Sequence, residues 1–365
     1  MNNQLLYQIA LTLIDGIGAV QAKLLIEHFE TADAIFKAKK KDLELIEGIG
    51  AYRAAQIKKF TDFNEAEDEI TFMQKFHIQP LFITDKNYPQ KLQHCYDAPT
   101  MLYYRGNADL NNTKSVSIIG TRTNTDYGKQ ITEKIVEELQ SYNVTIVSGL
   151  AFGIDAIAHK AAVKCNLPTI GVLAHGLDSI YPAQHKSLAT EMLQNGGLLT
   201  EFKKNTKADK HNFPRRNRIV AGMTNATIVI ETAAKGDSMI TAELAFNYNR
   251  DLFAIPSRIT DTKSAGCLKL IQQNKAALFT STDQMLEELG WKQKSKKAIV
   301  QTELFIELTP DEQIIIDIIK QKETVGIDEI FNKSSLSSSS VAAAILNLEL
   351  QNVVLGLPGK MYKLS

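Results

Sequence analysis

Two glycine-containing loops carry residues whose types and spacing suit the binding of an anion. Gly120, Thr121 and Arg122 follow a short apolar run, and Gly149 and Gly153 lie in the loop after the next apolar run. Backbone N–H groups beside glycines at a helix N-terminus attract anions, and an arginine can hold a phosphate from its side. The same glycines could instead only permit tight turns and close helix packing. The loops therefore leave two interpretations open, a phosphate site or a structural turn.

The usual nucleotide-binding fingerprints are missing from the sequence. It contains no G-x-x-x-x-G-K-[ST] and no G-x-G-x-x-G after a strand. We therefore expect a phosphate to be held at the edge of a site, without a buried pyrophosphate.

The segment 201–218 is the most basic part of the chain. It holds seven Lys and Arg residues against two acidic ones, whereas the whole chain has 41 basic and 41 acidic residues. It also holds Phe213. Cations that follow a nucleic-acid backbone and an aromatic ring that stacks a base are the components of a single-strand groove. For Lys203–Lys210 the competing interpretation is an ordinary solvated surface.

The end of this segment, Pro214 to Arg218, is different because it begins a helix. Pro214 suits the first turn, but Arg215, Arg216 and Arg218 oppose the positive end of the helix dipole. These arginines therefore either pair with acidic neighbours or bind an anion.

The elements around the two loops alternate between strand and helix. Strands are predicted at 116–119 and 144–147, each followed by a helical pattern, the first at 127–140 and the second from about 153. This order predicts a parallel sheet with right-handed crossovers, and the alternation continues to residue 290. Ligands of such sheets lie beyond the carboxyl ends of the strands, so both loops should meet at one edge.

The first 70 residues contain an internal repeat. Leu13–Ala22 recurs as Leu45–Ala54, each copy with a G-I-G turn between two helical patterns. This arrangement resembles a tandem helix-hairpin-helix domain, in which hairpin amides can hold a DNA phosphate. The alternative is that the turns only close a helical bundle, since Asp15 and Glu47 would repel phosphate.

The last part of the chain has its own pattern. Residues 292–301 are predicted to be a linker, and Thr309, Pro310 and Glu312 form a capped helix start. Three helices and a hairpin over 302–365 resemble a winged helix. Its third helix lacks Lys and Arg, which argues against reading the DNA major groove and favours a protein-interaction or covering role.

Composition indicates a globular protein of two or three domains. The chain has 365 residues, of which 44% are hydrophobic. No stretch approaches a membrane span, so we expect a cytoplasmic protein without a membrane partner. The three cysteines have no C-x-x-C spacing and are expected to be reduced. Asp155 and His159 lie four residues apart, but no third ligand is evident, so no metal is predicted and a hydrogen-bonding role for Asp155 is favoured.

Several motifs together resemble the DNA-processing protein A (DprA/Smf) family, from about residue 88 to 278. In chain order they are Tyr88-Pro89, Tyr104-Arg105-Gly106-Asn107, Ile119-Gly120-Thr121-Arg122, Tyr127-Gly128, Val147-Ser148-Gly149-Leu150-Ala151, Gly153-Ile154-Asp155, Ala158-His159, Gly176-Leu177-Asp178, Tyr181-Pro182, Phe213-Pro214, Arg216-Asn217-Arg218 and Ile240-Thr241-Ala242.

The resemblance implies an α/β, extended Rossmann fold with a parallel-rich sheet. The expected domains are a helix-hairpin-helix domain at 1–70, the Rossmann domain at 71–291 and a winged-helix-like domain at 302–365. It further implies a protein without catalysis or cofactor that binds and protects incoming single-stranded DNA and loads the RecA recombinase during natural transformation.

The resemblance also implies particular residues. The predicted DNA-binding residues are Gly120, Thr121, Arg122, Gly149, Gly153, Lys186, Phe213, Arg215, Arg216, Asn217 and Arg218. A homodimer contact is expected on the helix that carries Leu268, Leu270 and Ile271.

Two departures and one alternative accompany the resemblance. Phe152 stands where the family usually has arginine, and Lys235 to Ser238 differ from the commoner serine-glycine pattern. The alternative is a Rossmann-type nucleotide-processing enzyme similar to phosphoribohydrolases, with Glu231 and Glu243 as candidate carboxylates. The P-G-G-x-G-T motif of those enzymes is absent from this chain.

Overall fold

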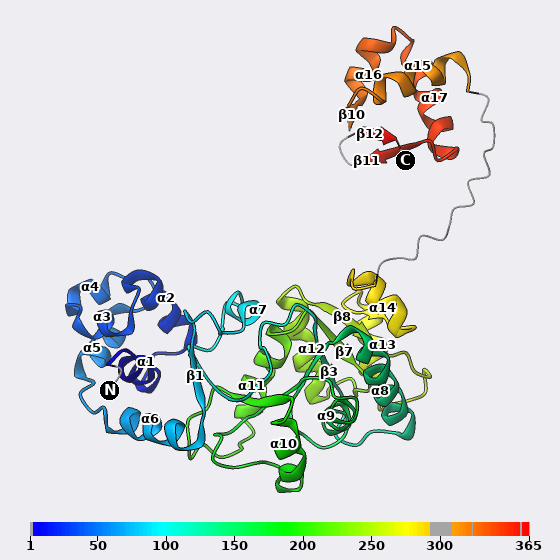
Figure 1. The fold of residues 1–365 in the computed structure, drawn as a ribbon. Helices are drawn as coiled ribbons and strands as arrows, with labels where there is room; N and C mark the ends of the chain where they lie inside the picture. The colour runs from blue at the N-terminus through cyan, green and yellow to red at the C-terminus, as the bar shows by residue number, and fades with distance from the viewer. Residues whose placement is uncertain (1–2, 293–307, 323, 358–359, 365) are drawn as a thin grey trace. The chain divides into compact units, whose positions relative to one another are not determined.

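The chain divides into two compact units, residues 1–293 and 294–365. The structure is a computed structural model that describes residues 3–292, 308–322, 324–357 and 360–364 (Figure 1). Most of the predicted linker, 292–301, and the start of the predicted third domain lie outside the described residues.

A nine-stranded sheet forms the centre of the first unit. Its strand order is β1-β2-β6-β5-β4-β3-β7-β8-β9, and all pairs from β6 to β9 are parallel. The first two strands pair antiparallel, β1 with β2 and β2 with β6. The strands are β1 Gln79–Phe82, β2 Met101–Gly106, β3 Ser115–Ile119, β4 Thr145–Ser148, β5 Thr169–Val172, β6 Gly196–Thr200, β7 Ala226–Val229, β8 Asp251–Ala254 and β9 Ala277–Leu278.

Helices cover both faces of this sheet because successive strand residues point to opposite sides. Ile118 and Ile228 pack with α8, α9 and α14, whereas Val147 and Val229 pack with α11, α12 and α13. The helices are α7 Gln90–Gln93, α8 Asp126–Leu139, α9 Ile154–Lys164, α10 Lys186–Met192, α11 Asn212–Gly222, α12 Asp237–Asn247, α13 Ala265–Gln272 and α14 Thr282–Glu288.

The N-terminal helices lie at the β1 end of the sheet (Figure 1). They are α1 Asn3–Leu13, α2 Ala19–Phe29, α3 Ala32–Lys37, α4 Lys40–Glu44, α5 Gly50–Lys59 and α6 Asn64–Phe76. The predicted domain end at residue 70 falls inside α6, which is continuous to Phe76. The division of 1–293 into two domains therefore stays a prediction.

The second unit is a small helical domain with a three-stranded sheet of order β10-β12-β11. Its elements are α15 Pro310–Ile319, β10 Val325–Gly326, α16 Ile327–Ser334, α17 Ser338–Leu350, β11 Val354–Leu357 and β12 Met361–Leu364. The predicted capping box is present, since Thr309 N donates to Glu312 Oε2 at 2.8 Å and Thr309 Oγ1 accepts from Glu312 N.

The architecture confirms the predicted fold class. The parallel-rich sheet follows the predicted alternation of strands and helices, with a helical region before it and a winged-helix arrangement after it. No helix in the described part of the chain combines the length and the apolar character needed to cross a bilayer.

Candidate functional site

The carboxyl ends of β3, β4 and β7 form one edge of a cavity of about 660 Å³. Strand order reverses at β3, because β4 lies on one side of it and β7 on the other. Open α/β sheets bind ligands at such a switch point. Gly120, Arg122 and Gly149 line this cavity, so the prediction that the two loops meet at one edge is confirmed.

Arg122 extends from the loop after β3 and remains half-exposed. Its Nη2 lies 2.9 Å from Asp237 Oδ2 in the first turn of α12, and its side chain is 53% exposed. The guanidinium also lies over the ring of Phe213, 5.3 Å from the centroid. Arg122 is therefore held above the cavity while part of its charge faces solvent.

Arg216 reaches the same cavity from α11 but is buried. Its Nη1 donates to the carbonyl of Val172, and its Nε has no hydrogen-bond partner among the described residues. Asp155, also buried, is the nearby carboxylate. Burial lowers the pKa of Arg216 and raises that of Asp155, and each group opposes the shift of the other through its charge. Arg216 is thus a buried cation in the wall of the cavity.

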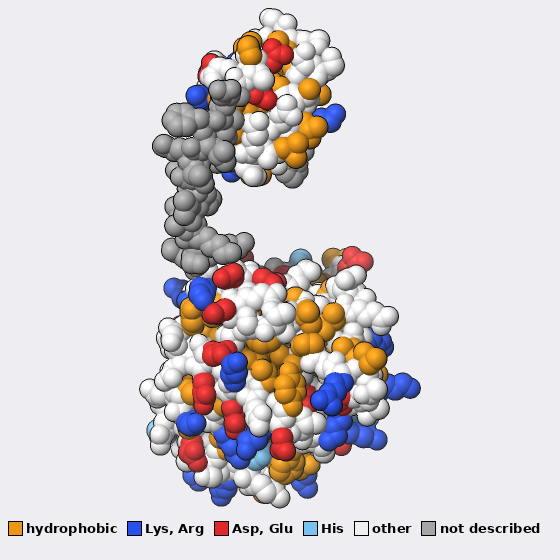
Figure 2. Space-filling view, turned by 90° about the vertical axis from the view of Figure 1, so that its right-hand side faces the viewer, with side chains coloured by type: hydrophobic (Ala, Val, Ile, Leu, Met, Phe, Trp, Pro, Cys, Tyr) orange, Lys and Arg blue, Asp and Glu red, His pale blue; other side chains and the backbone are white. Residues whose placement is uncertain are grey.

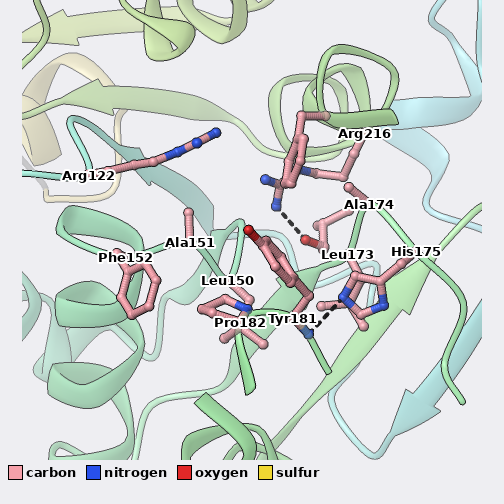
Figure 3. A pocket seen from close by; sticks show the side chains of 12 residues that line it. Arg122, Leu150, Ala151, Phe152, Leu173, Ala174, His175, Tyr181, Pro182 and Arg216 are labelled. Carbon is pink, nitrogen blue, oxygen red and sulfur yellow. Dashed lines mark hydrogen bonds between the residues drawn. The ribbon is translucent and has the colours of Figure 1, made fainter. Parts of the chain in front are cut away.

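Figure 3 shows Arg122 and Arg216 approaching from different sides, with the hydroxyl of Tyr181 between them. Tyr181 is exposed, and its ring centroid lies 6.2 Å from that of Phe213. His175 positions this tyrosine, since its Nε2 accepts from Tyr181 N at 3.2 Å while its Nδ1 donates to the Gly176 carbonyl. Acceptance at Nε2 requires a neutral ring, and burial lowers the pKa of His175.

The predicted loop amides are largely used within the protein. Thr121 N donates to the Glu231 carbonyl at 2.7 Å, and Ala151 N donates to Asp155 Oδ2 at 3.4 Å. The second bond confirms the predicted hydrogen-bonding role of Asp155, which occupies the N-terminus of α9. These two amides are therefore not free to bind an anion, which leaves the arginines as the candidate groups at this edge.

The glycines of the loops are required by close packing. A Cβ on Gly120 would lie 2.9 Å from the Cβ of Ile154, and one on Gly149 would lie 2.7 Å from Arg216 Cζ. Gly153 has φ +79°, and a Cβ there would lie 2.7 Å from the carbonyl of Arg122. These contacts support the structural interpretation of the glycines, and they also bring the arginines close to the sheet.

Glu231, the carboxylate of the alternative enzyme, points away from the cavity. It is buried, accepts from Thr125 N at 2.9 Å, and also accepts from the Thr125 hydroxyl at the start of α8. It is not among the described residues that line the cavity. Glu243 on α12 instead pairs with Lys275 at 2.6 Å.

His159 is a buried structural histidine. Its Nδ1 lies 2.7 Å from Thr169 Oγ1, and its Nε2 donates to the Gly149 carbonyl. Burial lowers its pKa to about 4. Within the described residues no group of His, Cys, Asp or Glu side chains could hold a metal ion.

Arg215 and Arg218 do not join Arg122 and Arg216. Both contact Glu201 Oε2, at 3.3 Å and 2.5 Å, and line a separate groove that runs to α2. This differs from the predicted arrangement, in which these arginines share one edge. The reason is helical spacing, because residues three apart lie on one face of α11 and Arg216 lies on another.

The first half of the basic segment is neutralised by α6. Lys203 pairs with Glu65, and Lys204 Nζ lies 3.6 Å from Asp68 Oδ2. The buried carboxylate of Glu69 accepts from Lys204 N at 3.1 Å. These lysines therefore attach the N-terminal helices to the sheet domain and leave fewer charges for a ligand.

The remaining predicted residues differ in whether they line the cavity. Asn217 is buried and lines the cavity, whereas Lys186 is exposed at the start of α10 and lines neither the cavity nor the groove in the described part of the chain. Lys210 and Lys235 are exposed and line the cavity; Lys235 was not predicted, and Lys210 was left open between a groove and a solvated surface. Their position in the basic segment and in the loop after β7 was the available signal.

The three residues predicted at the dimer contact differ in how far they are buried. Leu270 is fully buried in the core and cannot contact a partner directly, whereas Leu268 and Ile271 are partly exposed. Leu278 on the edge strand β9 is 44% exposed. Figure 2 shows apolar side chains among charged ones on the face where α13 and α14 lie.

The hairpins of the N-terminal repeat are fastened to each other. Arg53 donates to the carbonyls of Gly16 and Gly48, and the Tyr52 hydroxyl donates to Asp15 at 3.1 Å. Gly18 N donates to the side chain of Gln21. These contacts favour the interpretation in which the turns close a helical bundle.

The fold and site define an open α/β protein with a cationic, aromatic cavity at its switch point. The chain also matches three sequence families: DNA recombination-mediator protein A over residues 79–290, the DprA winged helix domain over 305–360, and the SAM-like helix-hairpin-helix tandem over 9–61. The chain therefore belongs to the DNA recombination-mediator protein A (DprA/Smf) family, as the resemblance predicted.

Individual relatives agree with this assignment. Protein Smf of Synechocystis is 33% identical over 399 residues, covering 99% of both chains. DNA processing protein DprA of Streptococcus pneumoniae is 40% identical over 222 residues, covering 60% of this chain and 78% of the relative.

Two solved structures are similar as well. The crystal structure of DNA processing protein A from Streptococcus pneumoniae superposes with a TM-score of 0.68 at 35% identity, covering 78% of this chain and 97% of that one. A structure of DNA processing protein A from Helicobacter pylori, which concerns single-stranded DNA binding by that protein, has a TM-score of 0.53 at 32% identity, covering 59% and 96%.

Proposed function

We propose that this chain binds single-stranded DNA in the cavity at the ends of β3, β4 and β7. The observation that carries the proposal is that Arg122 and Arg216 line one open cavity together with Phe213 and Tyr181. Guanidinium groups bind phosphates, and exposed rings stack bases without regard to sequence. The single-strand binding described for the Helicobacter pylori relative supports the same ligand.

Within this proposal Gly120, Thr121, Arg122, Gly149, Phe213, Arg216 and Asn217 border the strand. Lys210 and Lys235 add exposed positive charge to the same cavity. Gly153 acts through the packing of its loop. Arg215 and Arg218 are assigned to the groove around Glu201, and Lys186 to the surface, so none of these three is expected to contribute strongly.

The proposal assigns binding to the cavity and no catalytic step. Glu231 is buried against Thr125 and the start of α8, which supports a structural role for it. Incubation of purified protein with nucleoside monophosphates tests this assignment. Base release that disappears in Glu231→Gln would favour the nucleotide-processing alternative.

Membership of the family leads us to propose further steps. The bound strand is protected and passed to the RecA recombinase during natural transformation, in the cytoplasm, by a homodimer. A strand-exchange assay on strands coated with a single-strand-binding protein measures RecA loading. If this protein does not stimulate strand exchange by RecA, the proposed loading step is wrong, whereas the proposed DNA binding is unaffected.

The experiment compares two exposed arginines by fluorescence polarisation with oligo-thymidylate. Arg122 and Arg215 are 53% and 58% exposed, but only Arg122 lines the cavity. Arg122→Ala should weaken binding and lower the slope of log affinity against log salt by about 0.7, the value for one phosphate contact on a single strand. Arg215→Ala should bind within about twofold of wild type, because its charge lies outside the cavity.

The proposal fails if Arg122→Ala combined with Lys210→Ala binds oligo-thymidylate as tightly as wild type. It fails equally if Arg215→Ala alone removes the salt dependence. Circular dichroism of each variant verifies that the fold is retained.

A further inference from the structure

Phe152 is an exposed aromatic residue in a small pocket of about 40 Å³ that adjoins the cavity and shares Arg122, Tyr181 and Arg216 with it. It lies in the loop between β4 and α9, and its side chain is 46% exposed. It lines the same space as Arg122, Tyr181 and Arg216 (Figure 3). The exposed ring therefore presents an apolar face to a ligand that enters this pocket.

The ring of Phe152 is held in place by a residue that is itself fixed. Its centroid lies 4.9 Å from that of His185, with the two planes tilted by 67°. His185 is buried, and its Nδ1 donates to the carbonyl of Leu150 at 2.8 Å. A ring that is positioned before a ligand arrives loses little conformational freedom on binding.

The loop that carries Phe152 is also tied to the loop that carries Arg122. Ile154 N donates to the Thr121 carbonyl at 3.2 Å. The conformation of Gly153 leaves no room for a side chain between the two loops. The backbones that carry Phe152 and Arg122 are therefore held together.

We infer that Phe152 is a base-stacking residue, and this inference rests on the proposed single-strand binding. If the phosphates of a strand lie against Arg122 and Arg216, its bases lie beside these arginines. Phe152 lines a pocket together with both arginines, so its ring is within reach of such a base. The ring of Phe213 is already stacked against the guanidinium of Arg122 and lies near Tyr181. Phe152 provides a second aromatic position, separate from that pair, for a nucleobase of the same strand.

The test uses oligo-thymidylate and an abasic oligodeoxynucleotide of equal length, each measured by fluorescence polarisation. Phe152→Leu keeps apolar volume and removes the π face, whereas Phe152→Trp keeps a face. Phe152→Leu should bind oligo-thymidylate about tenfold more weakly, a typical value for one stacked base, and should bind the abasic strand as wild type does. Phe152→Trp should bind both strands at least as well as wild type.

Phe76→Leu is the matched control, because Phe76 on α6 is 39% exposed and lies away from the cavity. It should leave both affinities unchanged. The inference is overturned if Phe152→Leu binds oligo-thymidylate normally, or if it loses affinity equally for both strands. Failure of wild-type protein to bind either strand would instead remove the proposed function itself.

Discussion

Replacing Gly149 by alanine should disturb the buried charge that the cavity depends on. A Cβ at this position would lie 2.7 Å from Arg216 Cζ, whereas ordinary contacts are 3.4–4 Å. Arg216 must therefore move by at least about 0.7 Å, which disturbs its hydrogen bond to the Val172 carbonyl. Asp155 is crowded by the same methyl group, so neither buried group can shift freely.

The expected cost combines two effects. Overpacking a dense interior costs about 1–3 kcal/mol, and weakening a hydrogen bond to a charged group costs about 1.5–3 kcal/mol. Because the two effects overlap, we expect Gly149→Ala to lower the free energy of unfolding by about 3 kcal/mol. Urea unfolding followed by circular dichroism measures this loss as a lower midpoint at unchanged slope. Affinity for oligo-thymidylate should fall in the same variant.

A double-mutant cycle identifies the contact responsible. Arg216→Met removes the Cζ and nitrogen atoms that the methyl group would meet, so Gly149→Ala should cost at least about 1 kcal/mol less in that background. Gly18→Ala is the control, because its Cβ would meet only the end of the flexible Gln21 side chain, at 3.1 Å. It should cost no more than about 1 kcal/mol. Wild-type stability of Gly149→Ala, or an equal cost in both backgrounds, would refute the reasoning.

Further predictions concern the buried His159 and two leucines of α13. His159 has its pKa lowered to about 4, so between about pH 6.5 and 4 the unfolded chain binds a proton that the folded chain excludes. Stability should therefore fall by roughly 3 kcal/mol across that window, and the fall should be smaller in His159→Asn, measured by urea unfolding at each pH. Leu268→Glu should yield a monomer in light scattering, whereas Leu270→Ala should lower the unfolding free energy by about 2–5 kcal/mol, since Leu270 is fully buried. A dimeric Leu268→Glu would contradict the proposed contact.

Local sequence patterns predicted the sheet and the meeting of its loops. Strand-length apolar runs alternate with helical patterns from residue 116 onward, and the rule for parallel sheets then places their following loops at one edge. Arg122 and Gly149 could be assigned to the cavity for this reason. The rule depends only on strand direction and chain order, both of which are readable from the sequence.

The domain boundary predicted at residue 70 lies inside α6, although the pattern of that helix was present in the sequence. The prediction ended one domain at residue 70, whereas the helix spans Asn64–Phe76. Ala66, Ile70 and Met73 are buried at helical spacing, and Glu65 lies in the first turn. Continuous periodicity was the available signal, and the assumed domain boundary interrupted it.

Partners that are distant in sequence could not be predicted. Lys203 and Lys204 contact acidic residues of α6, more than 130 positions away, and nothing local distinguishes those lysines from Lys207 or Lys210. Charge alone predicted one basic surface. In the folded chain Lys203 and Lys204 pair with α6, whereas Lys210 lines the cavity.

The two cavity arginines differ in what they can contribute. A buried charge is costly for stability, and an apolar side chain of similar size would often serve a core better than Arg216 does. Arg216 lies beside Asp155 in the wall of the cavity, a position that fits the proposed ligand better than a role in folding alone. Because its guanidinium is already ordered, Arg216 can fix where a phosphate lies at little entropic cost. Arg122 is half-exposed, so its attraction acts through solvent and should account for more of the salt dependence.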